Sequence, residues 1–469
     1  MLLLLILSLT LFALGLLSAV AYFLLSATKY YGPRAGTAGE AVSVQILVLG
    51  DIGRSPRMTY HALSIAKHGG KVDLIGYLET SPHPDVVNNP NITITSLPTP
   101  PSRPPSIPFI LFAPFKVIHQ VIHLTHLLSH TLPPAQWLLV QNPPTIPTLA
   151  IASLTCRLRN TKLIIDWHNY GWTILANTRG STRHPLVILS KLYECYFGRL
   201  GDLHLTVTNA MARQLRNPPY SVPGPMLAVH DRPASIFQPV TSPQTRLSTL
   251  RRVLPTHETA MLAPHILSGT TRLLVSSTSW TPDEDFSLLL DALVEYAASS
   301  DTPGSTNPPL LAIITGKGPQ QAHYLARIAE LTAAGHLPNI RIATAFLPFA
   351  DYAALLACAD LGVCLHRSSS GVDLPMKVVD MFGAGLPVAA YCGYESFGEL
   401  VREGENGMGF ETAGELAGVL GRLLGGGDGA KGELGRLKEG AIREGKRRWD
   451  EEWDGTVGVG LGLVSGRGK

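Results

Sequence analysis

The chain has 469 residues, enough for about two or three domains; 45% of its residues are hydrophobic and 16% are charged. Its net charge of +3 and the lack of a basic patch interleaved with aromatic residues exclude a nucleic-acid-binding protein. Its cysteines are odd in number and far apart, which argues against a disulfide framework and a zinc site: Cys156, Cys195, Cys358, Cys364 and Cys392.

The first segment, residues 1–27, is an almost unbroken Leu-rich run without a charged side chain. Roughly 20 such residues can cross a bilayer as a helix, so the run predicts one N-terminal transmembrane anchor. A cleaved signal peptide is the alternative, but the run is long for a signal core and lacks a positively charged start. Lys29 and Arg34 directly follow the anchor, and the positive-inside tendency therefore places the body of the protein in the cytosol.

Residues 42–78 are typical of a strand, a glycine turn, an amphipathic helix and a second strand. The glycines of the turn, GDIGRSPR, are misplaced for a dinucleotide fingerprint. However, Gly53 lies beside Arg54 and Arg57 at the start of the helix, which indicates a phosphate site. Surface arginines without a ligand are the alternative.

Residues 109–132, FILFAPFKVIHQVIHLTHLLSHTL, are too polar for a membrane span and too apolar for an ordinary exposed helix. His119, His123, His126 and His130 recur at helical spacing and share one face. A metal cluster is one interpretation, but no carboxylate or cysteine joins the histidines. We favour an amphipathic helix that lies on the membrane and brings a lipid-linked substrate close to the sheet.

Two further buried strands, within WLLVQNPP and LIIDWHNYGWTIL, end in polar residues where α/β proteins bind their ligands. Asp166 and His168 lie at the end of the second strand. Because imidazole titrates near neutral pH and a carboxylate can orient it, this pair is a candidate for general-base chemistry. A hydrogen-bonded network without a chemical role is the alternative.

The second half of the chain opens, at RLLVSSTSW, with a strand and a turn that contains Ser277 and Thr278. Asp283-Glu284-Asp285 resembles a metal-binding DxD motif, but acids in the first turn of a helix are the interpretation that we favour. A later glycine turn, ITGKGP, places Lys317 where it can contact a phosphate.

Residues 359–391 carry a strand, a Ser/Gly turn with Ser369, Ser370 and Gly371, a short helix and another strand. The free N–H groups at such a helix start form an anion site. Lys377 adds a charge to it, and Asp380 lies on the same face, so that one phosphate and one diol would satisfy both. An ordinary βαβ unit is the alternative.

The predicted organisation has six parts. They are an anchor (1–27), a linker (28–43), a first Rossmann-like domain (44–217), a crossover with a flexible insertion (218–271), a second Rossmann-like domain (272–411) and a glycine-rich C-terminal part (412–469). In the last part we expect helices over 414–424 and 433–453 and a poorly ordered tail without chemistry.

Five segments together resemble the chitobiosyldiphosphodolichol β-mannosyltransferase family of GT-B glycosyltransferases: GDIGRSPRMTYHALS, DWHNYGW, SSTSWTPDEDFSLLLDAL, ITGKGP and ADLGVCLHRSSSGVDLPMKVVDMFG. The resemblance implies an α/β fold of two Rossmann-like domains facing a cleft. It implies a GDP-mannose donor, a dolichol-linked chitobiosyl diphosphate acceptor and a β-1,4 product, made with inversion on the cytosolic face of the endoplasmic reticulum membrane. It implies no required metal or cofactor, and a complex with other dolichol-pathway mannosyltransferases is a further hypothesis.

The resemblance also assigns roles in the donor site. Asp380 matches the second acid of the GT-B paired-acid motif, which holds the ribose hydroxyls. The first acid aligns with Val372, so Asp373, one residue later, is a shifted substitute. The usual Arg and Lys that hold the donor diphosphate are missing, and Ser277, Thr278 and Asp285 occupy that neighbourhood. The charge must therefore come from Lys317, Lys377 and the backbone from Ser368 to Gly371, which includes Ser369 and Ser370.

For the acceptor, we assign Gly53, Arg54 and Arg57 to the diphosphate, His168 to the base and Asp166 to its orientation. The shifted acid keeps an alternative open, namely a catalytically silent, membrane-anchored homologue that binds nucleotide-sugar or scaffolds the pathway. A transferase with the same fold and another lipid-linked substrate is a second alternative, because sugar identity depends on pocket shape.

Overall fold

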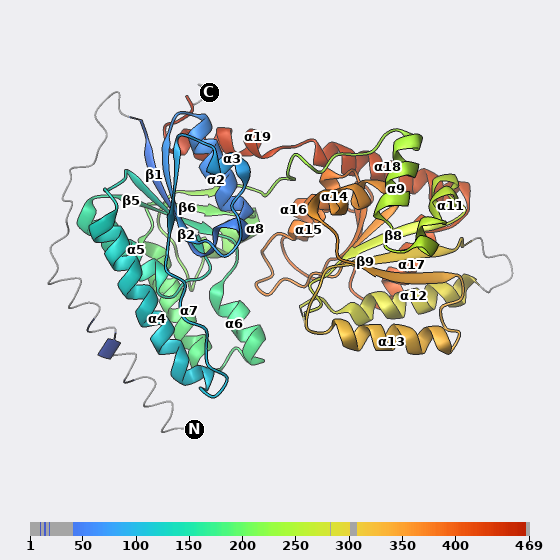
Figure 1. Ribbon diagram of the computed structural model, residues 1–469, viewed down its shortest axis with the longest axis horizontal. Helices are drawn as coiled ribbons and strands as arrows, with labels where there is room; N and C mark the ends of the chain where they lie inside the picture. Colours follow the sequence, from blue (N-terminus) through green and yellow to red (C-terminus); the bar gives the residue numbers. More distant parts are fainter. Residues whose placement is uncertain are drawn as a thin grey trace. The chain divides into compact units, whose positions relative to one another are not determined.

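The computed structural model describes residues 41–281, 283–300 and 307–465, together with residues 10, 14, 15 and 18. The chain forms two compact units, which are described separately here. Unit 1 comprises Met1–Val229 and Glu452–Lys469, and unit 2 comprises His230–Glu451. The last residues of the chain therefore belong to the first unit, as the red C-terminal segment in Figure 1 shows.

The predicted anchor, residues 1–27, lies outside the described residues except at four positions, and so does nearly all of the predicted linker. In the described part of the chain, no helix combines the length and apolarity that a membrane span requires.

Unit 1 is built on a seven-stranded parallel sheet with the strand order β3-β2-β1-β4-β5-β6-β7. The order reverses next to β1, which is the arrangement of a doubly wound Rossmann-like fold. Its strands are β1 (Ser43–Asp51), β2 (Lys71–Tyr77), β3 (Ile92–Ser96), β4 (Trp137–Asn142), β5 (Lys162–Trp167), β6 (Leu203–Thr206) and β7 (Met226–Ala228).

Helices connect these strands, and α7 begins at Pro185 and α8 at Asn209. The helices are α2 (Pro56–Lys67), α3 (Pro84–Val87), α4 (Phe109–His126), α5 (Thr148–Arg159), α6 (Gly171–Arg179), α7 (Pro185–Phe197) and α8 (Asn209–Arg216). Short 3₁₀ turns cover Ile52–Arg54 and Gly198–Leu200, and a π-helical turn, Leu127–Thr131, follows α4.

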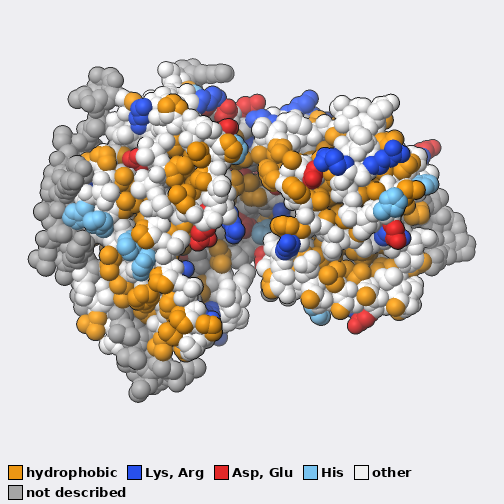
Figure 2. Space-filling model, viewed as in Figure 1, with side chains coloured by type: hydrophobic (Ala, Val, Ile, Leu, Met, Phe, Trp, Pro, Cys, Tyr) orange, Lys and Arg blue, Asp and Glu red, His pale blue; other side chains and the backbone are white. Residues whose placement is uncertain are grey.

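The predicted amphipathic helix is α4. Phe115 and Ile122 of this helix are 52% and 45% exposed. Its histidines lie together, with ring centroids 4.2 Å apart for His119 and His123. Figure 2 shows histidine and hydrophobic side chains at the surface over this part of unit 1. The helix is therefore confirmed, whereas its contact with a membrane stays a prediction.

Unit 2 repeats the same plan with a six-stranded parallel sheet in the order β10-β9-β8-β11-β12-β13. The strand β9 shows why its apolar run folds this way: all six residues of LLAIIT are buried, as in a sheet covered on both faces. The strands are β8 (Arg272–Ser277), β9 (Leu310–Thr315), β10 (Ile340–Ala345), β11 (Leu361–Cys364), β12 (Val388–Tyr391) and β13 (Gly407–Phe410).

The helices of unit 2 include three, α9, α10 and α11, inside the stretch 218–271, which the sequence assigns to a flexible insertion. Ser242 caps the start of α9 and Thr256 caps the start of α10. All three helices are short, which explains the weak hydrophobic periodicity of this stretch of sequence. The helices are α9 (Pro243–Val253), α10 (His257–Ala260), α11 (Ala263–Ser268), α12 (Phe286–Ser300), α13 (Gln321–Ala333), α14 (Phe349–Cys358), α15 (Met376–Gly383), α16 (Phe397–Leu400), α17 (Ala413–Leu424) and α18 (Asp428–Gly445).

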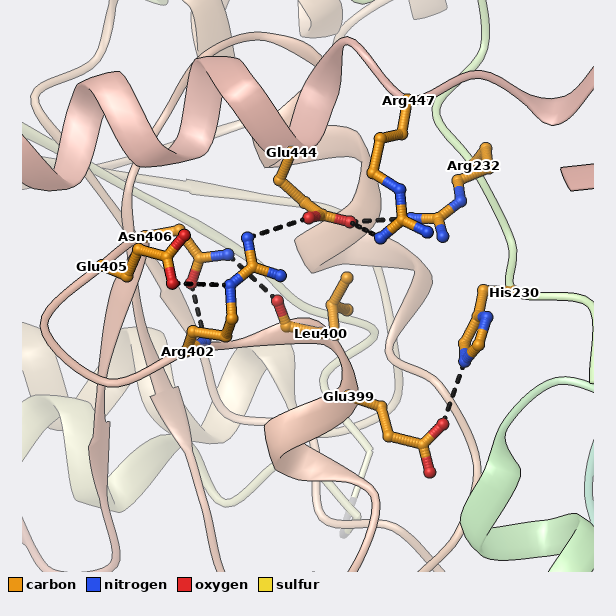
Figure 3. A network of polar contacts seen from close by, with 9 residues as sticks. All are labelled: His230, Arg232, Glu399, Leu400, Arg402, Glu405, Asn406, Glu444 and Arg447. Carbon is orange, nitrogen blue, oxygen red and sulfur yellow. Dashed lines mark hydrogen bonds and ion pairs between the residues drawn. The ribbon is translucent and has the colours of Figure 1, made fainter. Parts of the chain in front are cut away.

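A buried carboxylate fastens the end of α18 to unit 2 (Figure 3). Glu444 is 3% exposed and contacts three guanidinium groups, those of Arg232 at 2.7 Å, Arg402 at 3.1 Å and Arg447 at 3.2 Å. Arg232 is itself buried, so its positive charge and the negative charge of Glu444 must compensate each other. The contact with Arg232 holds the end of α18 against the segment that opens unit 2.

The C-terminal tail differs from the sequence prediction. The expected helix over 433–453 is divided into α18 and α19 (Trp449–Trp453), and a π-helical turn, Asp454–Gly458, follows. Trp453 and Val457 are fully buried and Leu461 is 5% exposed. The glycine content suggested disorder, but hydrophobic side chains between the glycines pack this segment into unit 1.

Candidate active site

The unit 1 site is built around Asp166, the fifth residue of β5, whose carboxylate is completely buried. Arg57 of α2 binds it with two hydrogen bonds, from Nε to Oδ2 at 2.8 Å and from Nη2 to Oδ1 at 3.0 Å. Two histidines contact the same Oδ2 through Nε2, His168 at 2.9 Å and His61 at 3.2 Å. Burial alone would raise the pKa of Asp166, but Arg57 and the histidines hold it well below its usual range.

An ionised carboxylate only accepts hydrogen bonds, so the proton of a neutral His168 lies on Nε2. Its Nδ1 is then the basic nitrogen, and this atom has no hydrogen-bond partner within the described ranges. The side chain of His168 is 24% exposed, whereas Asp166 is inaccessible. The geometry therefore brings the predicted pair together, with the imidazole toward solvent and the carboxylate behind it.

A second buried carboxylate, Glu194 of α7, supports the loop that carries His168. It accepts hydrogen bonds from the amides of Gly171 at 3.3 Å and Trp172 at 3.2 Å, at the start of α6, and from Asn142 at 3.2 Å. Burial raises the pKa of Glu194 to about 7. The helix dipole and these donors nevertheless suit a negative charge, which fixes the end of the loop.

The residues assigned to the acceptor diphosphate separate into two groups. Arg54 is an exposed side chain at the 3₁₀ turn, and Gly53 donates its amide to Asp51, which also accepts from Thr80. Arg57, in contrast, is only 4% exposed, and its guanidinium group donates hydrogen bonds to Asp166 and to the carbonyl of Val229. We therefore reassign Arg57 from the diphosphate to the support of Asp166.

The unit 2 site begins at α15, which follows the Ser/Gly turn as predicted and has Pro375 as its N-cap. The backbone N–H groups of Met376 and Lys377 donate to no acceptor in the described part of the chain. The ammonium of Lys377 contacts Glu284, whose side chain is 4% exposed. Burial lowers the pKa of Lys377 to about 8, partly offset by Asp283. Donors thus collect at one helix start, where an anion is favourable.

Asp380 lies one turn further along α15. Burial raises its pKa to about 7, and no hydrogen bond or ion pair of the described residues reaches its carboxylate. Its charge, after burial, contributes to raising the pKa of Tyr352, whose hydroxyl lies 3.0 Å from that of Ser277. A half-buried carboxylate without a partner is unfavourable unless a ligand supplies donors.

Asp373, the shifted substitute for the first acid, is 7% exposed and lies 3.3 Å from His366. Burial opposes the charge of His366, but the hydrogen bond and charge of Asp373 outweigh it and raise the pKa of this histidine. In the turn itself, Gly371 has a φ of +77° and donates to the hydroxyl of Ser368 at 2.7 Å, while Val372 donates to Ser370. Part of the turn is therefore already hydrogen-bonded internally.

Lys317 is exposed, and its ammonium lies 4.0 Å from the ring centre of Phe346, with no carboxylate partner among the described residues. The glycines on either side of it are required, because a Cβ at Gly316 or Gly318 would collide with the carbonyl groups of Thr278 and Ser279. The glycine turn is thus packed against the turn after β8. The predicted donor residues Thr278 and Lys317 come from these two adjoining turns, and Ser277 is the last residue of β8.

The acidic triplet has two separate structural roles. Asp285 accepts from the amide of Ser287 at 3.2 Å and caps α12 from the position before its first residue, so it does not lie in the first turn as the sequence interpretation expects. Glu284 instead turns inward, where it accepts from Thr278 at 2.8 Å and contacts Lys377. Within the described residues, no group of three acidic, histidine or cysteine side chains could hold a metal ion.

Sequence reasoning missed four residues of these sites: His61, Glu194, Glu284 and Trp453. Each of them contacts a residue that is distant in the sequence, and the largest separation is the 392 positions between His61 and Trp453. Only Glu284 had a local signal, as the central acid of its triplet.

The chain is closely similar to proteins that share one name, chitobiosyldiphosphodolichol beta-mannosyltransferase. The protein of Arthroderma benhamiae is 47% identical over 451 residues, which cover 96% of this chain and 97% of the relative. The Homo sapiens protein is 41% identical over 440 residues, covering 88% and 91%. The Mus musculus protein is 40% identical over 445 residues and covers 90% of both chains.

The chain belongs to the chitobiosyldiphosphodolichol beta-mannosyltransferase family. The family predicted from the five sequence segments is thereby confirmed, and the chain is an enzyme of the glycosyltransferase class. No protein-family profile matches the chain.

Solved structures support the fold of this mannosyltransferase family member. Sucrose-phosphate synthase from Thermosynechococcus elongatus matches with a TM-score of 0.61 at 15% identity, over 90% of this chain and 98% of that one. The Anabaena protein HepE, in complex with UDP and glucose, matches with a TM-score of 0.57 at 13% identity, over 86% and 95%. These likenesses confirm two Rossmann-like parallel-sheet domains of the GT-B kind.

Proposed function

We infer that this protein transfers mannose from GDP-mannose to chitobiosyl diphosphodolichol and forms a β-1,4 linkage with inversion. The observation that carries the inference is the extended identity to relatives named for this activity. The two polar sites, one in each unit, match the two halves of such a reaction.

The acceptor half would use unit 1. We propose that Nδ1 of His168 removes the proton of the acceptor 4-hydroxyl, while Asp166 stabilises the resulting imidazolium through Nε2. The acceptor oxygen then attacks the anomeric carbon of mannose, and one displacement inverts its configuration. Gly53 and Arg54 are the candidates for the acceptor diphosphate, since Arg54 is exposed at a helix start.

The donor half would use unit 2. The bond between mannose and phosphate breaks, and the departing GDP takes the electron pair, so that fixed positive charge stabilises it. Lys317, Lys377 and the amides at the start of α15 supply this charge. Asp380 accepts hydrogen bonds from the ribose hydroxyls, which provide the donors that its carboxylate lacks.

We propose further that the protein acts at the endoplasmic reticulum membrane with its catalytic domains in the cytosol. Residues 1–27 would span the membrane once, and α4 would lie on its surface. A complex with other mannosyltransferases of the dolichol pathway belongs to the same proposal. Protease protection of microsomes, with a tag at either end, tests the orientation.

The activity is tested by incubating purified protein with labelled GDP-mannose and synthetic chitobiosyl diphosphate-lipid, in the presence of EDTA. We expect a product that β-mannosidase cleaves, formed without free metal or any other cofactor. Binding of GDP by a folded protein without any product would instead support a silent homologue or another acceptor.

A further inference from the structure

The buried network of Asp166 extends beyond the residues that would meet the substrate. Trp453, at the end of α19, is fully buried, and its indole Nε1 lies 2.9 Å from Nδ1 of His61. His61 is also completely buried, and its Nε2 lies 3.2 Å from Oδ2 of Asp166. A continuous chain of contacts thus joins the C-terminal segment to His168.

The direction of each hydrogen bond follows from the chemistry of the groups. An indole N–H can only donate, so Nδ1 of His61 accepts and the ring proton of a neutral His61 lies on Nε2. Burial lowers the pKa of His61, which favours this neutral form. Nε2 of His61 then donates to Asp166, beside the donors of Arg57 and His168.

We propose that Trp453 is a positioning residue, which fixes the tautomer of His61 and thereby sets how strongly Asp166 attracts the proton of His168. This inference rests on the proposed function, because it assigns His168 to the acceptor proton. The charged and titratable groups that face Asp166 are Arg57 and His61 from α2 and His168 from the loop after β5.

Without the indole N–H, His61 no longer has a fixed donor on Nε2, and Asp166 loses one of its hydrogen bonds for part of the time. Fewer hydrogen bonds then stabilise the negative charge of Asp166, so this carboxylate attracts the proton of His168 more strongly. His168 should therefore take up its second proton at a higher pH. The base would be blocked over a wider acidic range.

The test compares Trp453→Phe with the wild-type chain in the mannose-transfer assay between pH 5.5 and 8.5. We expect the acid limb of the kcat profile to move up by roughly half a pH unit, which lowers kcat on that limb by up to about threefold. KM for GDP-mannose should stay within about twofold, because the donor residues belong to unit 2. Asp454→Ala is the control: it removes the 2.8 Å contact between Asp454 and His68, next to Trp453, but leaves the relay intact.

A pair of variants at His61 keeps the test decisive if Trp453→Phe does not fold. The side chain in His61→Gln can both accept from the indole and donate to Asp166, so the acid limb of the kcat profile should stay at its wild-type position. In His61→Leu the limb should move to higher pH, because leucine can do neither. A wild-type pH profile in folded Trp453→Phe and His61→Leu would overturn the proposal. So would full activity of His168→Ala.

The relay can also be tested without turnover. An NMR titration of the His168 ring in the full chain should show its midpoint at higher pH in Trp453→Phe than in the wild type. If the wild type makes no mannosylated lipid but this midpoint moves, the proposed function fails and the relay stands. An unchanged midpoint in an active enzyme refutes the relay alone.

Discussion

At the level of single residues, His168 is the group that we propose as the base for the acceptor hydroxyl. Its neighbours restrict it to one protonation pattern, with Nε2 bonded to Asp166 and Nδ1 available. This pattern arises because Asp166 is buried with Arg57 and cannot turn away toward water. The imidazole is therefore preorganised before an acceptor binds.

The first prediction concerns this base. We expect His168→Ala to lower kcat by about a hundredfold or more, because a positioned base contributes on the order of 10²–10⁴ in rate. Binding of GDP-mannose, measured by calorimetry, should remain within about twofold. His336→Ala, at an exposed position of unit 2, is the control. Near-normal turnover of His168→Ala would remove His168 from the mechanism.

The second prediction concerns Asp380. Its folded-state pKa of about 7 lies above the ordinary value of 3.8, so its ionisation lowers stability as the pH rises through this window, and the penalty is complete above pH 7. Asp380→Asn should therefore raise the free energy of unfolding by about 1–3 kcal/mol at pH 8 and by less at pH 5. It should also weaken GDP binding at least about tenfold, because the ribose hydroxyls lose a charged acceptor.

Urea unfolding at the two pH values and calorimetry with GDP measure both effects. Asp291→Asn, on the exposed face of α12, is the matched control and should change neither. Stabilisation without loss of GDP binding would show that Asp380 does not contact the donor.

At the level of elements, α18 shows how a glycine-rich segment can be tightly packed. A Cβ at Gly440 would collide with the carbonyl of Glu405, and one at Gly445 with that of Phe382. Gly435 of the same helix has no atom within 4 Å of such a position. Glycine therefore allows close backbone approach at two positions and merely weakens the helix at the third.

The third prediction separates these two roles. Gly440→Ala and Gly445→Ala should each destabilise unit 2 by about 1–3 kcal/mol, because backbone must move to admit the methyl group. Gly435→Ala should stabilise it by about 0.5–1 kcal/mol through helix propensity. Urea midpoints of the three variants measure the difference. Three equal shifts would contradict the packing described for α18.

At the level of the whole molecule, the chain crosses from unit 1 to unit 2 near residue 230 and returns to unit 1 near residue 452. The returning segment buries Trp453, Val457 and Leu461 in unit 1, and Asp454 contacts His68 of α2. It is therefore a structural part of the unit that contains His168.

The fourth prediction follows from this return. Removing residues 452–469 should lower hydrogen-exchange protection in α2 and at the end of β5, since both lose buried contacts. Protection of β8 and β9 in unit 2 should stay unchanged. Exchange measured by mass spectrometry, with a shorter deletion of residues 466–469 as the control, tests it. Equal loss of protection in both units would contradict the assignment of this segment to unit 1.

The sequence by itself determined the parallel α/β class, the family and the local pairs of polar residues. Asp166 and His168, or Lys377 and Asp380, lie within single strand–helix units, where short spacing fixes which side chains share an edge or a face. Their strands are also visible locally, because both faces are buried and the runs are apolar.

Only the tertiary structure decided which distant groups complete these pairs. It brought Arg57 and His61 to Asp166 and Trp453 to His61, joined Glu284 to Lys377, and packed residues 453–461 into unit 1. Such partners depend on strand order and on the return of the chain, which local periodicity does not encode. A buried charge needs compensation from whatever the fold places beside it, so its partner cannot be read from neighbouring positions.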